Sequence, residues 1–273
     1  MISSRDVLLF QEKILAWYSL NKRDLPWRKT RDPYSILVSE IMLQQTQVER
    51  VIPKFTGWMS AFPDVSSLAK ASQRDVLALW SGLGYNRRAL YLHKTAQVIV
   101  DEYQGVFPRD LQILQKLPGI GTYTSAAVLC FAYNNQIPVL DTNIKKVITH
   151  EFFSGNMPSE EMLFDVAQKI LPVGKAYDWN QALMDYSRII LKDKKIPIPK
   201  QSRFLSSDRY YRGQVVKLLL KIEKISFSGL WDFFQDMNPV EKERLHTILE
   251  KMHKEQLIFY DKKKITLLEV KGE

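Results

Sequence analysis

Apolar residues recur at three- and four-residue steps along most of the chain, which is the spacing of one face of an α-helix. Residues 7–17 show this pattern, and residues 34–42 repeat it after Asp32 and Pro33, which suit the N-cap and the first position of a helix. Few segments alternate between apolar and polar residues as strands do. The pattern predicts a mostly α-helical protein built from short helices. Prolines punctuate the later helices at Pro53, Pro63, Pro108, Pro118, Pro138 and Pro158.

The helical pattern stops at residues 192–203, where KDKKIPIPKQSR combines several lysines with two prolines. We place a domain boundary there, between a domain of residues 1–200 and a smaller one of residues 201–273. Three helices and a terminal β-hairpin are expected in the smaller domain, and this order predicts a winged helix, an α+β fold related to the helix-turn-helix. The expected helices and strands are residues 211–222, 228–234, 239–256, 257–260 and 265–268.

The 273-residue chain has a formal net charge of +9, which favours a polyanionic partner without identifying one. Its apolar runs are too short to cross a bilayer, and charged residues near the N-terminus exclude a signal peptide, so we expect a cytoplasmic protein without a membrane partner. A single cysteine, Cys130, excludes an internal disulfide and any site that needs several thiolates. Its apolar helical surroundings predict that it is buried.

The segment 117–124 combines a tight turn, Leu-Pro-Gly-Ile-Gly, with the start of an apolar helix, Thr-Tyr-Thr. Gly119 and Gly121 allow the backbone to approach a ligand closely, and the first amides of the following helix offer donors for a phosphate. Residues 80–85, WSGLGY, form a similar turn between two apolar helices, although an ordinary glycine helix terminus explains them equally well. The turns indicate that the protein binds a nucleic-acid backbone.

Two carboxylates are candidates for acid–base chemistry. Glu40 lies on a predicted helix beside Ile36 and Leu43, and apolar neighbours raise the pKa of a carboxyl group and can keep it protonated as a general acid. Asp141 precedes a predicted helix, where an N-cap carboxylate accepts backbone hydrogen bonds that keep it ionised. One neutral and one ionised acid can divide the work of breaking a glycosidic bond. An ordinary glutamate at the edge of the core is the alternative for Glu40.

With these residues, the chain strongly resembles the helix-hairpin-helix DNA glycosylases, and within them the MutY-type adenine glycosylases. The resemblance runs from about Leu25 to Tyr186, and its SEIMLQQTQV segment is highly specific. It implies a two-lobed fold, with a six-helix barrel of about residues 25–133, a second lobe of residues 1–24 and 134–200, and a target base flipped into the cleft between them. The matching segments are LPWR (25–28), DPY (32–34), VSEIMLQQTQVERVIPKF (38–55), LWSGLGY (79–85), LPGIGTYTSAAVL (117–129), VLDTN (139–143) and WNQALMDY (179–186).

The resemblance also implies catalytic roles for four residues. Glu40 would protonate adenine at N7 and act on the water, and Asp141 would stabilise or transiently trap the sugar cation. Tyr123 would lie near these acids. Relatives that cut the strand through a Schiff base have lysine at this position, so Tyr123 implies a monofunctional glycosylase. Asn143 would support Asp141. Ordinary packing for Tyr123 and a helix-start role for Asn143 are the alternatives.

The resemblance and the glycine turns together give a set of expected DNA contacts. Gln45 and Tyr85 match residues that enter the base stack near the lesion; a polar helix-end residue and a core tyrosine are the alternatives. The basic segment after residue 192 is expected to contact phosphates, with a solvated linker as the alternative. The expected DNA-binding residues are Gln44, Gln45, Tyr85, Arg28, Arg31, Gly119, Gly121, Thr122, Thr124, Lys194 and Lys195.

The chain departs from the family pattern in one respect that concerns a cofactor. MutY-type enzymes hold an iron–sulfur cluster with four cysteines after the segment that matches residues 179–186. Here no cysteine follows Cys130. We therefore predict no cluster, no other cofactor and no metal, and expect the basic segment to supply the phosphate contacts of the missing cluster loop. Residues 201–273 are also too few for the Nudix-like domain that reads 8-oxoguanine in such enzymes.

Together these observations predict a monofunctional, monomeric DNA glycosylase that removes adenine mispaired with 8-oxoguanine or guanine from double-stranded DNA. A thymine or uracil mismatch glycosylase is one alternative, because the turn at 117–121 and Asp141 fit both activities. A non-catalytic DNA-binding protein, in which the winged helix does the binding, is another, although the intact pair of Glu40 and Asp141 disfavours it.

Overall fold

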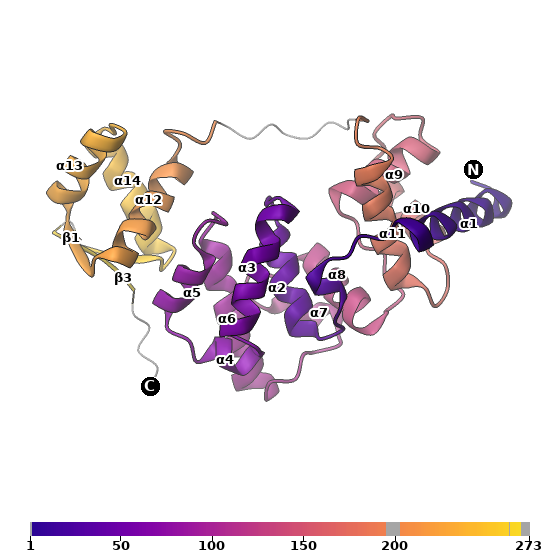
Figure 1. Ribbon diagram of the computed structural model, residues 1–273, viewed down its shortest axis with the longest axis horizontal. Coiled ribbons are helices and arrows are strands. Elements are labelled where there is room, and N and C mark those ends of the chain that lie inside the picture. The colour runs from indigo at the N-terminus through magenta and orange to yellow at the C-terminus, as the bar shows by residue number, and fades with distance from the viewer. Residues whose placement is uncertain (1, 195–202, 262, 269–273) are drawn as a thin grey trace. The chain divides into compact units, whose positions relative to one another are not determined.

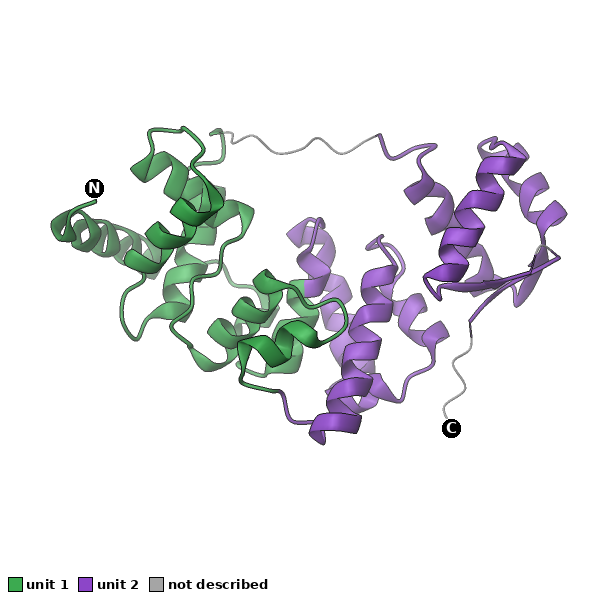
Figure 2. Ribbon diagram, turned by 180° about the vertical axis from the view of Figure 1, so that it is seen from behind, with its two compact units in different colours: residues 1–40, 108–199 green, residues 41–107, 200–273 purple. Residues whose placement is uncertain are grey.

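Helices dominate the computed structural model, as the apolar periodicity predicts. The structure describes residues 2–194, 203–261 and 263–268. The chain forms two compact units, each assembled from two stretches of sequence: unit 1 from residues 1–40 and 108–199, and unit 2 from residues 41–107 and 200–273 (Figure 2). The boundary predicted near residue 200 lies outside the described residues. The domain limits 1–200 and 201–273, and the limits of the six-helix barrel, stay predictions.

Unit 1 contains α1 (Ser4–Asn21), the 3₁₀ helix η1 (Pro26–Arg28), most of α2 (Pro33–Leu43), α7 (Leu111–Lys116), α8 (Thr122–Tyr133), α9 (Thr142–Phe152), α10 (Glu160–Lys169) and α11 (Ala176–Ile189). α11 packs against α1, α8 and α9. In this core the ring of Phe10 on α1 meets Phe152 and Trp179 edge to face, at centroid distances of 5.0 and 5.6 Å. The apolar face of α1 therefore closes the helical core of unit 1.

A buried ion-pair cluster fixes η1 and the residues before it to α11. The Asp185 carboxylate accepts hydrogen bonds from Nη1 and Nη2 of Arg28, at 2.7 and 2.9 Å, and from Nε of Arg23 at 2.5 Å. Burial alone would raise the pKa of Asp185, but the hydrogen bonds and charges of the two guanidinium groups hold it below its usual range. Arg28, whose side chain is 8% exposed, thus has a structural role. Its expected DNA contact stays a prediction.

Unit 2 contains the end of α2, α3 (Val48–Ala61), α4 (Val65–Ala69), α5 (Gln73–Trp80), α6 (Arg87–Tyr103), α12 (Asp208–Lys221), β1 (Lys224–Ser226), α13 (Phe227–Met237), α14 (Lys242–Lys254), β2 (Ile258–Tyr260) and β3 (Lys264–Leu267). Trp58 of α3 and Trp80 of α5 are fully buried, and their rings meet edge to face at 5.6 Å. None of the helices in the described part of the chain has the length and apolar character that a membrane span requires.

The C-terminal elements of unit 2 form a winged helix, as predicted (Figure 1). Their order is helix, strand, two helices and a β-hairpin, and the antiparallel sheet has the strand order β1-β3-β2. β3 is central, so that Ile265 pairs with Ile225 on one side and with Tyr260 on the other. β1 was not expected from the sequence, because three residues between two helices are too few to show strand alternation. The first helix of this fold begins at Asp208 rather than at residue 211.

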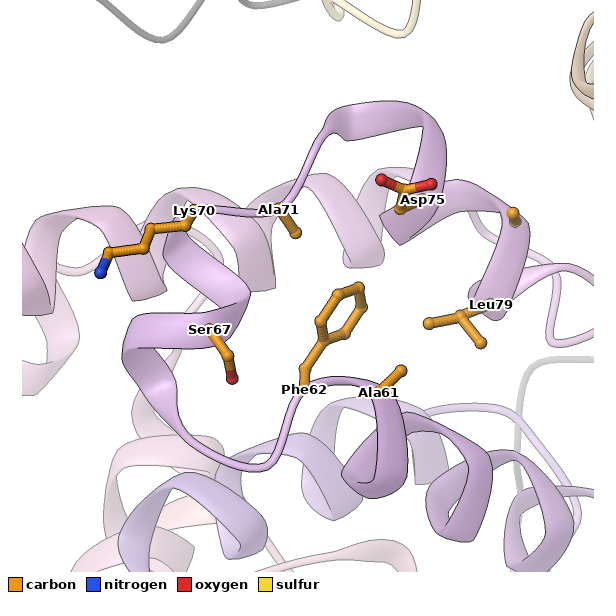
Figure 3. A pocket seen from close by; sticks show the side chains of 8 residues that line it. Ala61, Phe62, Ser67, Lys70, Ala71, Asp75 and Leu79 are labelled. Carbon is orange, nitrogen blue, oxygen red and sulfur yellow. The ribbon is translucent and has the colours of Figure 1, made fainter.

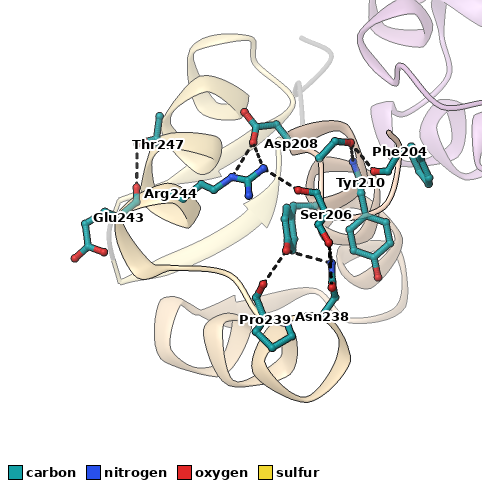
Figure 4. A network of polar contacts seen from close by, with 11 residues as sticks. Phe204, Ser206, Asp208, Tyr210, Asn238, Pro239, Glu243, Arg244 and Thr247 are labelled. Atoms are coloured by element: carbon teal, nitrogen blue, oxygen red, sulfur yellow. Dashed lines mark hydrogen bonds and ion pairs between the residues drawn. The ribbon is translucent and has the colours of Figure 1, made fainter. Parts of the chain in front are cut away.

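Polar contacts fix the start of α12 to the helices that follow it (Figure 4). Arg244 of α14 donates from Nη2 to Oδ1 of Asp208 at 2.9 Å and to the carbonyl oxygen of Ser206 at 2.8 Å. The Tyr211 hydroxyl donates to the carbonyl oxygen of Pro239 at 2.9 Å. Because Tyr211 is fully buried, this bond satisfies a polar group that would otherwise be costly in the core. The winged helix therefore holds α12 in one orientation.

Candidate active site

Glu40 lies in the last turns of α2 and is 6% exposed. The apolar residues around it in the sequence are themselves buried, among them Ile36, Val38 and Ile41. The pKa of Glu40 is raised to about 7, chiefly by burial and also by the nearby negative charge of Asp141, whereas a hydrogen bond from Tyr123 and the charge of Arg28 act to lower it. The sequence-based expectation of a carboxyl group with a raised pKa agrees with this geometry. At neutral pH a large fraction of Glu40 carries a proton.

Tyr123, the second residue of α8, contacts Glu40 directly. Its hydroxyl donates a hydrogen bond of 2.6 Å to Oε2 of Glu40. Burial and the neighbouring carboxylates raise the pKa of Tyr123 well above its ordinary value, so the phenol is a neutral donor across the physiological range. The bond occupies one carboxyl oxygen of Glu40 and leaves Oε1 as the position for the proton.

Asp141 is the N-cap residue of α9. Its Oδ1 accepts from the backbone amide of Ile144 at 2.7 Å, and its Oδ2 accepts from Nδ2 of Asn143 at 2.6 Å. Burial outweighs these bonds and raises the pKa of Asp141 above its ordinary value, whereas the sequence-based expectation rested only on the bonds that keep the carboxylate ionised. Because Asp141 is partly exposed, solvent screening limits the effect of burial. Asn143 contacts Asp141, the arrangement that the resemblance implies.

The segment that leads into Asp141 is held by a residue that was not singled out from the sequence. Asn180 of α11 is 2% exposed, and its Oδ1 accepts a hydrogen bond of 3.1 Å from the backbone amide of Val139. Its Nδ2 donates to the carbonyl oxygen of Ala176 at 2.8 Å. A buried asparagine on an otherwise apolar helix face is a signal of such a contact, because an unpaired amide would be expensive there. Asn180 therefore helps to place Asp141.

The glycine turn at 117–121 joins α7 to α8 as a helix-hairpin-helix. The backbone of Gly119 has a φ of 74°, which glycine adopts without strain. Gly121 is the N-cap residue of α8 and has no side chain that could accept bonds from the first amides of the helix. Thr122 is exposed at this end, whereas Thr124 is buried. The turn thus leaves the first amides of α8 without a side-chain cap at Gly121, and the phosphate contact expected there stays a prediction.

In unit 2, half-buried Arg88 connects the two segments that carry the other expected DNA-binding residues. Gln44 and exposed Gln45 follow the end of α2, and Tyr85, which is 39% exposed, ends the second glycine turn. Gln45 and Tyr85 both have positive φ values, 55° and 48°. Nη1 of Arg88 donates to the carbonyl oxygens of Ile41, Met42 and Gln44 at 2.7, 3.2 and 2.5 Å, and Nη2 donates to those of Leu83 and Gly84 at 3.2 Å.

Nothing in the sequence distinguishes Arg88 from a surface arginine, because its partners are backbone carbonyl groups and the Thr46 hydroxyl and not acids. Burial lowers its pKa to about 10, which leaves it charged at neutral pH. The positively charged guanidinium group of Arg88 donates to the last carbonyl groups of α2, and its charge is also stabilised by the negative end of the helix dipole. Arg88 therefore fixes both loops to one point.

The remaining expected DNA-binding residues lie in different surroundings. Arg31 places its guanidinium 3.2 Å from the ring centre of Tyr177 and donates to the carbonyl oxygen of Phe131 at 3.0 Å. Lys194 is exposed. Lys195 lies outside the described residues. The DNA contacts of all three stay predictions.

Two surface hollows lie apart from these residues. A hollow of about 400 Å³ in unit 2 is bordered by the end of α3, by α4 and by α5, with Phe62 at its centre (Figure 3). Another, of about 790 Å³, lies in unit 1 among α1, α9 and α10. Neither lining contains Glu40, Tyr123 or Asp141. The candidate chemistry is therefore at the paired acids and not in these hollows.

An iron–sulfur cluster does not fit this chain. Cys130 is the only cysteine in the sequence and is fully buried in α8, where Nδ2 of Asn180 lies 3.3 Å from its sulfur. Burial raises the pKa of its thiol to about 12. A cluster needs four thiolates, and a single buried thiol cannot supply them.

Comparison with known proteins identifies the family of the chain. Residues 38–172 match the HhH-GPD superfamily of base excision DNA repair proteins. An adenine DNA glycosylase of Mycolicibacterium smegmatis is 45% identical over 162 residues, which are 59% of this chain and 55% of that protein. The chain spans about half the length of the curated relatives that it matches.

Solved structures show the same relationship. A thermostable thymine-DNA glycosylase is 32% identical, with a TM-score of 0.63 over 68% of this chain and 87% of that one. A non-covalent endonuclease III–DNA complex is 18% identical, with a TM-score of 0.61 over 69% and 87%, and this likeness concerns the fold. The predicted fold class is confirmed. The chain belongs to the HhH-GPD superfamily of base excision DNA repair proteins.

Proposed function

We propose that the protein is a monofunctional DNA glycosylase that removes adenine mispaired with 8-oxoguanine or guanine. The hydrogen bond of 2.6 Å between Tyr123 and Glu40 carries the proposal, because it orients a buried acid whose pKa is raised to about 7 and which senses the charge of Asp141. Adenine DNA glycosylases among the relatives support adenine as the base. Double-stranded DNA is the proposed partner, and the protein is proposed to act as a monomer without a cofactor.

In the proposed reaction, protonated Glu40 transfers its proton to N7 of the extruded adenine. The C1′–N9 bond then breaks and its electron pair leaves with the base, which the proton has made a better leaving group. Ionised Asp141 stabilises the positive charge that develops on the sugar. Water attacks C1′ and gives a proton to the Glu40 carboxylate, which restores the acid and leaves an abasic site.

The absence of strand cleavage follows from Tyr123. A lyase forms a Schiff base between an amine and the sugar carbon, and a phenol has no amine to offer. In this geometry the Tyr123 hydroxyl is also engaged with Glu40. Tyr123 is therefore proposed to orient the acid and not to attack the sugar.

The DNA contacts are proposed from the hairpin and the two loops. The amides after Gly119 and Gly121 bind a phosphate on the strand that carries the target base. Gln45 and Tyr85 enter the base stack and offset part of the cost of extruding the adenine. Arg88 acts indirectly, because it holds both loops by their carbonyl groups.

Base release from defined duplexes tests the proposal. Duplexes with adenine opposite 8-oxoguanine, adenine opposite guanine, thymine opposite guanine and uracil opposite guanine are incubated with the protein, and abasic sites are then cleaved with alkali. We expect cleavage of the two adenine duplexes only after alkali, and its loss in Glu40→Gln. Cleavage before alkali would contradict the monofunctional reaction, and no cleavage of any duplex would favour a non-catalytic DNA-binding protein.

A thymine or uracil mismatch glycosylase is the second candidate. The 32% identity to a thymine-DNA glycosylase, over 87% of its chain, favours it. The paired acids serve either base, since a carboxylate beside the sugar stabilises the same cation. Cleavage restricted to the thymine and uracil duplexes in the assay above would establish this activity in place of adenine removal.

A further inference from the structure

The ring of Tyr85 is held by the winged helix as well as by its own loop. Nη1 of Arg209, in the first turn of α12, donates a hydrogen bond of 2.6 Å to the Tyr85 hydroxyl. The Arg209 guanidinium carbon lies 5.6 Å from the Tyr85 ring centre, and that of Arg88 lies 5.5 Å from it. Both distances are those of a cation–π contact. A partly exposed tyrosine on a left-handed backbone turn thus has two cations against its ring.

The contact at Tyr85 is one of several that fix the winged helix to α5 within unit 2. Arg74 of α5 donates from Nη1 and Nη2 to the carbonyl oxygens of Leu219 and Leu220, at 3.3 and 2.8 Å, near the end of α12. Gln73, which is 6% exposed, donates to the carbonyl oxygen of Gln256 at 3.2 Å. Arg74 therefore fixes the end of α12 to α5, and Gln73 fixes the segment after α14 to the start of α5. Arg209 therefore reaches Tyr85 from a helix that is held at its opposite end.

We propose that Arg209 is a positioning and specificity-determining residue that acts through Tyr85, so that the winged helix sets how the protein distinguishes a mispair from paired DNA. The inference rests on the proposed function, in which the Tyr85 ring enters the base stack. A free exposed ring loses rotamer freedom when it inserts, whereas a ring held by its hydroxyl has lost that freedom beforehand.

The main alternative is that Arg209 is an ordinary cation for the DNA backbone. The two roles differ in what they do to paired DNA. A phosphate contact strengthens binding to every duplex and adds to the salt dependence of binding. A contact that orients Tyr85 strengthens binding only to a mispaired duplex, because the Tyr85 ring can insert only where a base pair is weakened.

Binding measurements in a Glu40→Gln background separate these roles, because the DNA stays intact. The dissociation constants are measured for a duplex with adenine opposite 8-oxoguanine and for the same duplex fully paired. We expect Arg209→Ala to lower the preference for the mispair by about tenfold, which is what loss of one charged hydrogen bond of roughly 1.4 kcal/mol gives. Binding to paired DNA and its salt dependence should stay the same.

Further variants test whether Arg209 acts through the Tyr85 hydroxyl. Tyr85→Phe should lower the preference to a similar extent, and the double variant should lose no more than either single one, because both remove the same bond. Arg209→Lys should restore part of the preference, since an ammonium group also donates. Lys217→Ala, which removes an exposed charge from the same helix, is the matched control and should keep the full preference.

The outcomes distinguish the inference from the function on which it rests. Additive effects of Arg209→Ala and Tyr85→Phe, or equal weakening on both duplexes, would overturn the positioning role while the glycosylase function stands. A protein with intact Arg209 and Tyr85 that shows no preference for the mispair would instead contradict the proposed function, and the inference with it. Thermal unfolding of each variant shows whether the winged helix has stayed folded.

Discussion

At the scale of single residues, Tyr123 has two effects on Glu40. Its hydroxyl orients the acid through a bond of 2.6 Å, and the same bond lowers the pKa of Glu40 against the larger effect of burial. The pKa of Glu40, which carries the proton that the reaction needs, is therefore lower than burial alone would make it. A weaker hold favours transfer to the base, because a general acid works best when its pKa lies near the working pH.

The pH dependence of base release tests this balance. Because Glu40 must be protonated, single-turnover release should fall as the pH rises through about 7. Tyr123→Phe removes a bond that lowers the pKa of Glu40, so the fall should move to higher pH in that variant. Tyr103→Phe, which changes a tyrosine at the end of α6, should leave the profile in place. An unchanged or lower pH for the fall in Tyr123→Phe would contradict the geometry.

Residue identity alone predicts some of this site and not the rest. The apolar neighbours of Glu40 already indicate a raised pKa, and the position of Asp141 before a helix indicates its cap. The bond between Tyr123 and Glu40 joins residues 83 positions apart, and no local pattern contains that distance. The resemblance to known glycosylases predicted that Tyr123 lies near the acids. The upward shift of the pKa of Asp141 depends on how closely other chain segments pack around it.

At the scale of elements, periodicity and capping residues predicted most helices because their signals are local. Three N-cap side chains accept a hydrogen bond from the backbone amide of the residue three positions later: those of Ser207, Ser226 and Asp141. β1 and the contacts of Arg88 escaped prediction for a common reason. A short strand and a half-buried arginine are both defined by backbone groups that are distant in sequence, which a single sequence does not display.

The importance of Arg88 for these elements can be measured directly. Arg88→Met removes the guanidinium group that donates to the carbonyl oxygens of Ile41, Gln44 and Gly84. This substitution should lower the free energy of unfolding by about 3 kcal/mol. Arg88→Lys should recover only part, since an ammonium group cannot reach both loops as a planar fork does. Urea unfolding measures both variants, with exposed Arg50→Ala as the control. A loss under 1 kcal/mol in Arg88→Met would show that water replaces these bonds.

At the scale of the whole molecule, the proposed acid makes the folded state less stable at neutral pH. The pKa of Glu40 is about 7 in the folded protein and 4.5 in its ordinary state, so folding takes up a proton between these values. As far as Glu40 is concerned, the free energy of unfolding is highest below pH 4.5 and falls as the pH rises through about 7. A buried acid of this kind is a cost that the rest of the fold must offset.

Glu40→Gln should therefore be more stable than the parent protein, and increasingly so at higher pH. Above pH 7 the gain should approach about 3 kcal/mol, because the pKa of Glu40 is 4.5 in its ordinary state and about 7 in the folded protein. Urea unfolding at pH 5 and pH 8 gives the difference, and exposed Glu102→Gln serves as the comparison. Equal stabilities of Glu40→Gln and the parent at both pH values would show that the carboxyl group is solvated in the folded state.

The buried thiol of Cys130 has a consequence for chemical labelling and for oxidation. Its pKa of about 12 leaves almost no thiolate at neutral pH, and thiol reagents and peroxides react with the thiolate. A cysteine introduced on the surface would then react with a thiol reagent while Cys130 does not. Fluorophores or spin labels could thus be attached to unit 1 and unit 2 at chosen positions, without removal of the natural cysteine, to follow the distance between the units when DNA binds.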